Sequence, residues 1–149
     1  MPDHQMQIGE VSERTRLSLR TIRYYEEVGL VPPSARSKGG FRLYTEADVE
    51  RLLLVRQMKP LDFSLEDMRD LLSVVDELDA DVGVVTDGSR QTLVDRLAAY
   101  HEAATQRIEA LREQLNVAET FAADLRRQIG RRSRLSPSSR RGPKRRERF

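Results

Sequence analysis

Residues 18–44, SLRTIRYYEEVGLVPPSARSKGGFRLY, decide the fold of this chain. Ser18 is suited to begin a helix, because its hydroxyl can accept a hydrogen bond from an unpaired backbone N–H of the first turn. Apolar residues then recur at steps of three and predict one buried stripe, formed by Leu19, Ile22 and Tyr25. Gly29 is placed to end this helix, because glycine readily adopts the left-handed conformation that often follows a helix.

A β-hairpin is predicted directly after this helix. The prolines at 32–33 prevent further helix, because proline has no N–H to donate. Gly39 and Gly40 then separate two short extended runs within residues 35–44. Upstream, spaced apolar residues indicate a first helix near residues 8–15. The sequence therefore predicts a helix-turn-helix followed by a hairpin wing.

The outer face of the second predicted helix is polar and basic. With the apolar stripe directed inward, five residues must point elsewhere: Arg20, Thr21, Arg23, Tyr24 and Glu27. Arginine can bind guanine through two hydrogen bonds and threonine can contact a thymine methyl group, so we expect Arg20 and Thr21 to face bases. The residues suited to phosphate oxygens are Ser18, Arg23 and Tyr24 on the helix and Arg36, Lys38 and Arg42 on the hairpin.

Two more helices are predicted before an acidic stretch. Thr45 with Asp48, and Ser64 with Asp67, each have the spacing of a capping box at the start of an apolar-periodic run. These helices complete a predicted DNA-binding domain at residues 1–75. Residues 76–91 are acidic and have no clear period, which predicts a solvated connector.

A long amphipathic helix is predicted at residues 92–130. No proline or glycine occurs between Thr92 and Ile129, and Gly130 is placed to end the helix. Apolar residues spaced by threes and fours form a coiled-coil seam with one irregular step; they are Leu93, Leu97, Tyr100, Ala104, Ile108, Leu111, Leu115, Ala118, Ala122, Leu125 and Ile129. At about 1.5 Å per residue this helix spans roughly 57 Å, too much for so small a domain to cover. A second copy is the simplest cover, so we expect a homodimer.

Charge is distributed unevenly along the chain. The net charge is +2 over residues 1–59, −8 over residues 60–130 and +8 over residues 131–149. Such a distribution indicates that one end of the chain faces a polyanion. The basic tail, residues 131–149, is predicted to be disordered when free. It is interpreted either as a solubilising end or as an arm that binds DNA non-specifically through counterion release.

Several classes of protein are disfavoured by composition. The absence of cysteine excludes disulfides and thiolate metal sites. His4 and His101 are far apart in sequence, and the acidic residues of 76–91 lack calcium-loop spacing, so we expect no metal site and no cofactor. No nucleophile–base pair or phosphate-binding glycine loop appears, which argues against an enzyme. No apolar run suits a membrane span or a signal peptide, so we expect a cytoplasmic, nucleoid-associated protein.

Residues 6–72 resemble the MerR family of transcription regulators. The motifs that carry the resemblance are dense and ordered; they are Ile8-Gly9-Glu10, Arg20-Thr21-Ile22-Arg23-Tyr24-Tyr25-Glu26, Gly29-Leu30 and Phe41-Arg42-Leu43-Tyr44. The resemblance implies a mainly α fold, with a winged helix-turn-helix DNA-binding domain and a long C-terminal helix that forms an antiparallel dimerisation coil.

The resemblance also implies a mode of action. Family members bind inverted repeats inside promoters whose spacers are too long, and they bend and untwist the spacer so that RNA polymerase engages both promoter elements. Binding energy is spent on deforming the DNA. By similarity, Arg20 and Thr21 would face bases, while Arg23, Tyr24, Arg42 and Tyr44 would hold the backbone of double-stranded DNA.

Two positions depart from the family pattern. The family usually has glycine where this chain has Arg16, in the turn between the first two helices, and where it has Asp62, before the second helix pair. Glycine supplies a positive φ at low cost, whereas arginine tolerates it poorly. We expect either a different turn or mild strain at Arg16.

The leading hypothesis is a homodimeric regulator that binds a promoter operator. The alternative is a nucleoid-type architectural protein with weak sequence preference, which the basic tail favours. The effector stays open, because this chain has neither the metal-binding cysteines nor the drug-binding domain of many similar regulators. The regulator could respond to a small molecule bound between the domain and the coil, or it could bind no ligand and be controlled by its abundance or by a partner protein.

Overall fold

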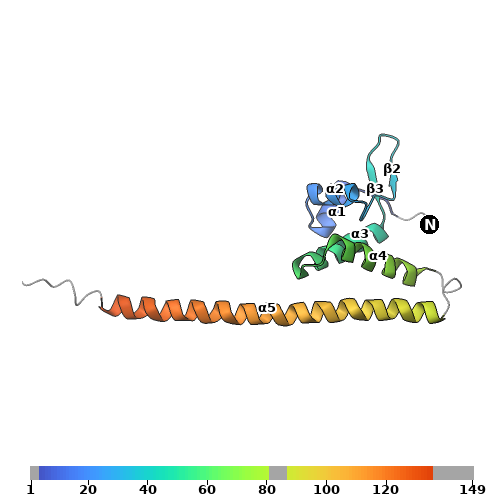
Figure 1. Cartoon of the computed structure of the whole chain (residues 1–149). Coiled ribbons are helices and arrows are strands. Elements are labelled where there is room, and N and C mark those ends of the chain that lie inside the picture. Colours follow the sequence, from blue (N-terminus) through green and yellow to red (C-terminus); the bar gives the residue numbers. More distant parts are fainter. Residues whose placement is uncertain (1–3, 81–86, 136–149) are drawn as a thin grey trace, which may run out of the picture. The chain divides into compact units, whose positions relative to one another are not determined.

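A computed structural model describes residues 4–80 and 87–135 of the chain (Figure 1). The chain divides into two compact units, residues 1–104 and 105–149. The elements, in chain order, are β1 (Met6–Gln7), α1 (Ile8–Thr15), α2 (Leu19–Glu27), β2 (Ala35–Arg36), β3 (Arg42–Tyr44), α3 (Glu46–Met58), the 3₁₀ helix η1 (Lys59–Leu61), α4 (Leu65–Asp79) and α5 (Asp87–Leu135). The predicted mainly α fold with a winged helix-turn-helix and a long C-terminal helix is confirmed.

The wing belongs to a three-stranded antiparallel sheet in the order β1-β3-β2. The predicted hairpin is confirmed, with Arg36 opposite Arg42, and β1 adds Met6 opposite Tyr44. Strand β1 was not predicted, because a run of two residues is too short to show the alternation of a strand. Pairing with β1 joins the base of the wing to the start of the chain.

The core of the first unit is formed by the inner faces of α1 to α4. Ile22 and Tyr25 of α2 are buried against it, as the stripe predicted, and so are Leu52 and Val55 of α3. Leu19 is an exception, because 39% of it is exposed. Leu19 is the first residue of α2, so it lies at the edge of the core and was wrongly assigned to the buried stripe.

The two predicted capping boxes are confirmed. The Thr45 hydroxyl accepts a hydrogen bond from the Asp48 N–H, and the Asp48 carboxylate accepts one from the Thr45 N–H. Ser64 and Asp67 form the same pair at the start of α4. Asp48 also accepts a hydrogen bond of 2.5 Å from Ser34, which links the segment before the wing to α3.

The two non-glycine turns adopt the left-handed conformation. Arg16 has a φ of 58° and Asp62 a φ of 62°. Each residue ends one helix and lies two residues before the serine that caps the next helix. Of the two expected outcomes at Arg16, the structure shows a strained residue in an unchanged turn. The amide of Arg16 donates to the Ser12 carbonyl at 2.9 Å and closes the end of α1.

The long helices extend further than the sequence predicted. Both ends of the predicted connector are helical, because α4 continues through Asp79 and α5 begins at Asp87; residues 81–86 lie outside the described ranges. Gly130 does not end α5, which reaches Leu135. A glycine inside a helix costs only about 1 kcal/mol, which the flanking turns can outweigh. Residues 131–135 of the predicted tail are therefore helical, and residues 136–149 lie outside the description.

The apolar stripe of α5 serves two different surroundings. Leu93 is buried, and Leu97 and Tyr100 pack against the core of the first unit. Leu93 therefore belongs to the core of its own subunit, whereas Leu97 and Tyr100 are only partly buried there, so their place in a dimer seam stays a prediction. In the second unit the stripe is exposed at Ile108, Leu111, Leu115, Leu125 and Ile129.

Replacing Arg16 with glycine should raise the free energy of unfolding by up to about 1 kcal/mol, because a non-glycine residue at positive φ stores strain that exceeds the added entropy of the unfolded chain. Urea unfolding at fixed protein concentration measures this. The control Glu13→Gly, at an exposed position inside α1, should lose about 1 kcal/mol. If Arg16→Gly lowered the free energy of unfolding as much as Glu13→Gly does, the contacts of the arginine side chain would outweigh the strain of its backbone.

Candidate DNA-binding surface

The start of α2 presents the predicted base-facing residues. Ser18 caps the helix by accepting a hydrogen bond from the Thr21 N–H at 3.1 Å, and its hydroxyl also lies 2.8 Å from that of Thr21. Arg20 and Arg23 are exposed, and within the described ranges neither forms an ion pair. Both guanidinium groups are therefore available to an outside anion or a base edge.

The two tyrosines of α2 point in different directions, Tyr24 toward the solvent and Tyr25 into the core. Tyr24 is 44% exposed, whereas Tyr25 is buried and its burial raises the pKa of the phenol. The two ring centroids are 5.8 Å apart. The prediction that Tyr25 packs in the core is confirmed, and Tyr24 keeps a hydroxyl that can reach an outside partner.

Glu26 joins the wing to α2. Its carboxylate accepts hydrogen bonds from Arg36 at 2.7 Å and from the Nε of Arg42, so one acid is shared by both predicted wing arginines. The Glu26 side chain is only 19% exposed, which shields these ion pairs from solvent. The hydrogen bond to Glu26 raises the pKa of the Arg42 guanidinium. The cluster keeps one net positive charge and fixes the wing relative to the helix.

The tip of the wing is exposed. Lys38 is exposed there, and Phe41 is 61% exposed beside it. A Cβ on Gly39 would lie 3.1 Å from the Phe41 ring, and Gly40 has a φ of +83°, so the ring packs over a turn suited to glycine. Phe41 adds an apolar surface to a basic tip.

Tyr44 does not lie on this surface. Its side chain is fully buried, and burial raises the pKa of the phenol. The hydroxyl has no hydrogen-bond partner among the described residues. The predicted contact of Tyr44 with the DNA backbone is therefore corrected: the residue belongs to the core, because β3 pairs with β1 on one side and its ring points inward.

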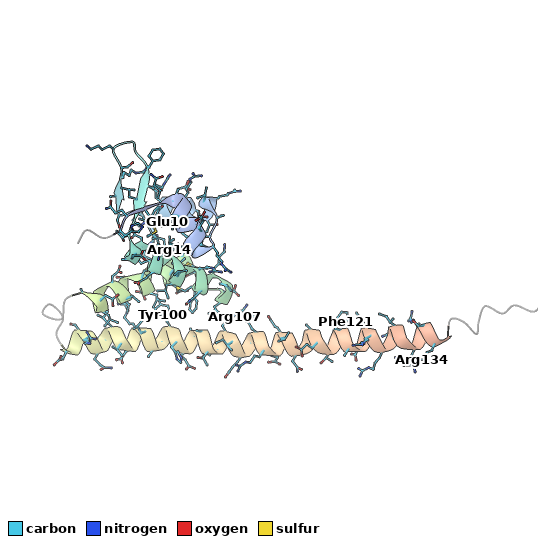
Figure 2. The ribbon with its side chains drawn as sticks, turned by 180° about the vertical axis from the view of Figure 1, so that it is seen from behind. Glu10, Arg14, Tyr100, Arg107, Phe121 and Arg134 are labelled. Carbon is cyan, nitrogen blue, oxygen red and sulfur yellow. The ribbon has the colours of Figure 1, made fainter. Side chains whose placement is uncertain are left out.

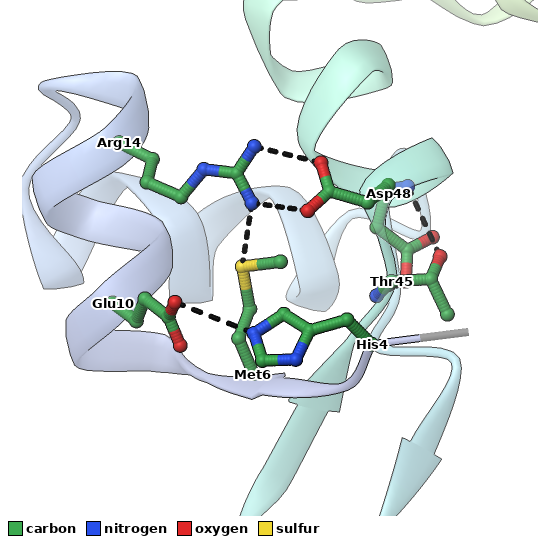
Figure 3. A network of polar contacts seen from close by, with 7 residues as sticks. His4, Met6, Glu10, Arg14, Thr45 and Asp48 are labelled. Atoms are coloured by element: carbon green, nitrogen blue, oxygen red, sulfur yellow. Dashed lines mark hydrogen bonds and ion pairs between the residues drawn. The ribbon is translucent and has the colours of Figure 1, made fainter. Parts of the chain in front are cut away.

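Two arginines outside the predicted set hold the frame. Arg69 of α4 donates to the Val28 carbonyl at 2.7 Å, at the end of α2. Arg14 of α1 binds Glu46 of α3 through two hydrogen bonds of 2.5 and 2.7 Å, and it also lies 3.4 Å from the Met6 sulfur (Figure 3). The ion pair lowers the pKa of Glu46. Because Glu46 is then charged at lower pH than a free glutamate, this pair persists in mild acid.

Sequence reasoning missed Glu26, Arg69 and Phe41 as contributors to this surface. Glu26 offered one signal, since a glutamate on the polar side of a helix can pair with arginines of a following hairpin. Arg69 offered none, because its partner is a backbone carbonyl 41 residues away.

Residues 4–80 and 87–135 contain no cluster of three or more side chains that could bind a metal ion. In the same ranges no helix combines the length and the apolar character that crossing a membrane requires.

Comparison with protein families matches residues 6–74 to the model described as MerR HTH family regulatory protein. The regulator ZntR of Escherichia coli strain K12 is 46% identical over 67 residues, which are 45% of this chain and 48% of ZntR. The matched stretch thus spans about half the length of that relative.

The transcriptional regulator YfmP of Bacillus subtilis is similar over a longer stretch. It is 30% identical over 135 residues, which are 89% of this chain and 96% of YfmP. Among solved structures, HiNmlR, a MerR family regulator lacking the sensor domain and bound to promoter DNA, is similar with a TM-score of 0.66. It is 20% identical and covers 89% of this chain and 96% of that one, which shows a shared fold.

Replacing Glu26 with glutamine should weaken specific DNA binding roughly fivefold, because a charge-assisted contact worth about 1 kcal/mol no longer positions Arg36 and Arg42. Fluorescence anisotropy with a fixed operator measures the affinity. The control Glu27→Gln removes the same charge from an exposed neighbour and should leave binding unchanged or slightly tighter. Tighter binding by both variants would contradict a positioning role for Glu26.

Replacing Tyr44 with phenylalanine should leave DNA affinity within about twofold and raise the free energy of unfolding by about 1 kcal/mol, because it removes a buried hydroxyl without a partner. Thermal unfolding and anisotropy on the same samples test this. The matched variant Tyr24→Phe should show the reverse, with unchanged stability and binding about fivefold weaker. If only the Tyr44→Phe variant lost affinity for DNA, Tyr44 would have to contact DNA after all.

Proposed function

Because this chain belongs to the MerR family of HTH regulatory proteins, we propose that it regulates transcription as a homodimer that binds an inverted repeat within a promoter. One observation carries the proposal: Arg20 and Arg23 project unpaired from α2, and Glu26 on the same helix holds the two wing arginines beside them. This places one basic helix and one basic wing together, as a groove and its flanking phosphates require.

The assignment of contacts follows from exposure. Arg20 and Thr21 lie in the first turn of α2, the part of a recognition helix that contacts base edges. Ser18, Arg23 and Tyr24 on the helix, with Arg36, Lys38 and Arg42 on the wing, hold the DNA backbone. The Thr21 methyl group remains available for a thymine while its hydroxyl faces Ser18.

The exposed half of the α5 stripe supports the homodimer. Leu115 is 57% exposed and Ile129 is 65% exposed, and a helix with such a stripe is stabilised by a partner. A twofold dimer presents two copies of α2 to two half-sites, so the operator is an inverted repeat.

Distortion of the spacer DNA and engagement of RNA polymerase at the promoter complete the proposed action, as the family resemblance implies. A regulator that holds two half-sites at a fixed separation spends binding energy on bending and untwisting the DNA between them. The proposed location is the cytoplasm, in association with the nucleoid, and the proposed mechanism requires no catalysis and no cofactor.

Replacing Arg20 with alanine should relax the base preference at one position of each half-site, at a cost of about 1–3 kcal/mol for the preferred base. Binding-site selection from a random library, repeated with genomic promoter fragments, measures it. The control Arg56→Ala removes an exposed charge from α3 and should keep the selected motif. A motif without inverted symmetry, or one unchanged by Arg20→Ala, would contradict the proposal.

A further inference from the structure

The net charge of α5 changes sign near the end of the helix. Residues 87–122 carry four arginines and six acidic residues, whereas residues 123–135 carry five arginines and one acidic residue. All five arginines of this last part are exposed; they are Arg126, Arg127, Arg131, Arg132 and Arg134. An ordered helix end with a net charge of +4 attracts a polyanion.

Four of these arginines and two small residues line one groove of about 660 Å³ on α5. We call this groove the arginine face; it is lined by Ala123, Arg126, Arg127, Gly130, Arg131 and Arg134. Successive members are one or three residues apart, which is the spacing of residues on a single side of a helix. The two small residues leave room for an anion between the guanidinium groups.

Most of the positive charge of the arginine face is not neutralised within the chain. Arg127 pairs with Asp124, the one acidic residue of 123–135. Within residues 87–135, Arg126 and Arg131 form no ion pair. The Nε of Arg134 donates to the Gly130 carbonyl at 3.2 Å, which lays this side chain along the helix without cancelling its charge. Three guanidinium groups can therefore bind an outside anion.

The arginine face lies away from the apolar stripe of α5. A helix turns about 100° per residue, so Arg127 lies about 200° around the helix from Leu125, and Arg131 lies about 200° from Ile129. Figure 2 shows Phe121 and Arg134 on different sides of α5. A second copy that covers the stripe, as in the proposed homodimer, therefore leaves the arginine face exposed.

The composition of the arginine face favours DNA over an anionic membrane. A helix that lies on a membrane buries large apolar side chains below the headgroups, but the apolar residues of this face are only Ala123 and Gly130. Arginine binds phosphate oxygens through two parallel hydrogen bonds. The distance from Arg126 to Arg134 along the helix is about 12 Å, over which B-DNA presents roughly three phosphates per strand.

We infer that the arginine face binds the phosphate backbone of double-stranded DNA that flanks the operator. The inference rests on the proposed function, which brings promoter DNA to α2, and it adds a contact outside the half-sites. DNA that is held at the operator keeps its flanking phosphates at a high local concentration, so weak contacts add to the affinity. The sequence after α5 stays basic, because residues 136–149 contain six basic residues and one acidic residue.

Two DNA duplexes and one double variant of the full-length chain test this inference. One duplex holds only the operator obtained by binding-site selection, and the other adds about 20 base pairs on each side. The wild type should bind the longer duplex about tenfold more tightly at about 0.15 M salt. Arg131→Gln combined with Arg134→Gln should abolish this gain and keep the affinity for the short duplex within about twofold, because only contacts with flanking phosphates are lost.

Salt dependence gives a second readout of the same contact. For the longer duplex, the slope of log affinity against log salt should fall by up to about four in the double variant, roughly one for each arginine removed from a dimer. The slope for the short duplex should not change. A fall of the same size on the short duplex would place the arginines at the operator and overturn the inference.

A matched control removes the same charge elsewhere on α5. Arg90→Gln combined with Arg112→Gln changes two exposed arginines outside the arginine face and should keep most of the gain from flanking DNA. Equal losses in the two double variants would assign the gain to net charge and overturn the inference. A wild type that binds both duplexes equally would also overturn it.

Failure of the inference can be distinguished from failure of the proposed function. The inference is measured by the difference between the two duplexes, whereas the proposed function is measured by preference for the operator over a scrambled duplex of the same length. Sedimentation with phosphatidylglycerol vesicles tests the membrane alternative. Vesicle binding that Arg131→Gln with Arg134→Gln abolishes, without any gain from flanking DNA, would assign the arginine face to a membrane and overturn the inference.

Discussion

Burial of one side of α2 is the constraint on which the surface depends. Ile22 and Tyr25 are sealed in the core, so the helix cannot rotate about its axis without exposing apolar surface. That fixed rotation leaves Arg20 and Arg23 facing outward. The hydrogen bond from Arg69 to the Val28 carbonyl holds the far end of the same helix. The orientation of the basic groups is therefore set by packing, and their charges have no part in choosing it.

Glu26 extends this constraint to the wing. An acidic side chain does not strengthen the attraction of this surface for a polyanion. Glu26 nevertheless holds two arginines together that would otherwise repel each other and sample many rotamers. The base of the wing is held further by pairing of β3 with β1 and by the buried ring of Tyr44. The tip with Lys38 and Phe41 is exposed, although hydrogen bonds between Ser37 and Phe41 close its turn. The short sheet therefore fixes the base of the wing and leaves its tip exposed.

Much of this architecture was predictable from local signals. The capping pairs at Thr45 and Ser64 and the stripe at Ile22 and Tyr25 act over three or four residues, so sequence spacing is sufficient to find them. The predictions were wrong where contacts with segments distant in the sequence determine whether a side chain is buried. Tyr44 was expected to contact DNA because of the family resemblance, but β3 pairs with β1 and the Tyr44 ring is buried. Leu93 continues the coil pattern, and no local feature reveals that its own subunit buries it. Gly130 failed as a stop signal because a single glycine costs a long helix little.

The two turns that contain Arg16 and Asp62 share one design. Each places a left-handed residue first, an apolar residue second and a capping serine third, as Arg16-Leu17-Ser18 and Asp62-Phe63-Ser64. A helix advances about 100° per residue, so the length of such a turn sets the angle at which the next helix begins. One added residue would swing every side chain of α2 by more than a quarter of a circle. Variation among chains of this architecture should hence fall on the identity of these three residues and spare their number.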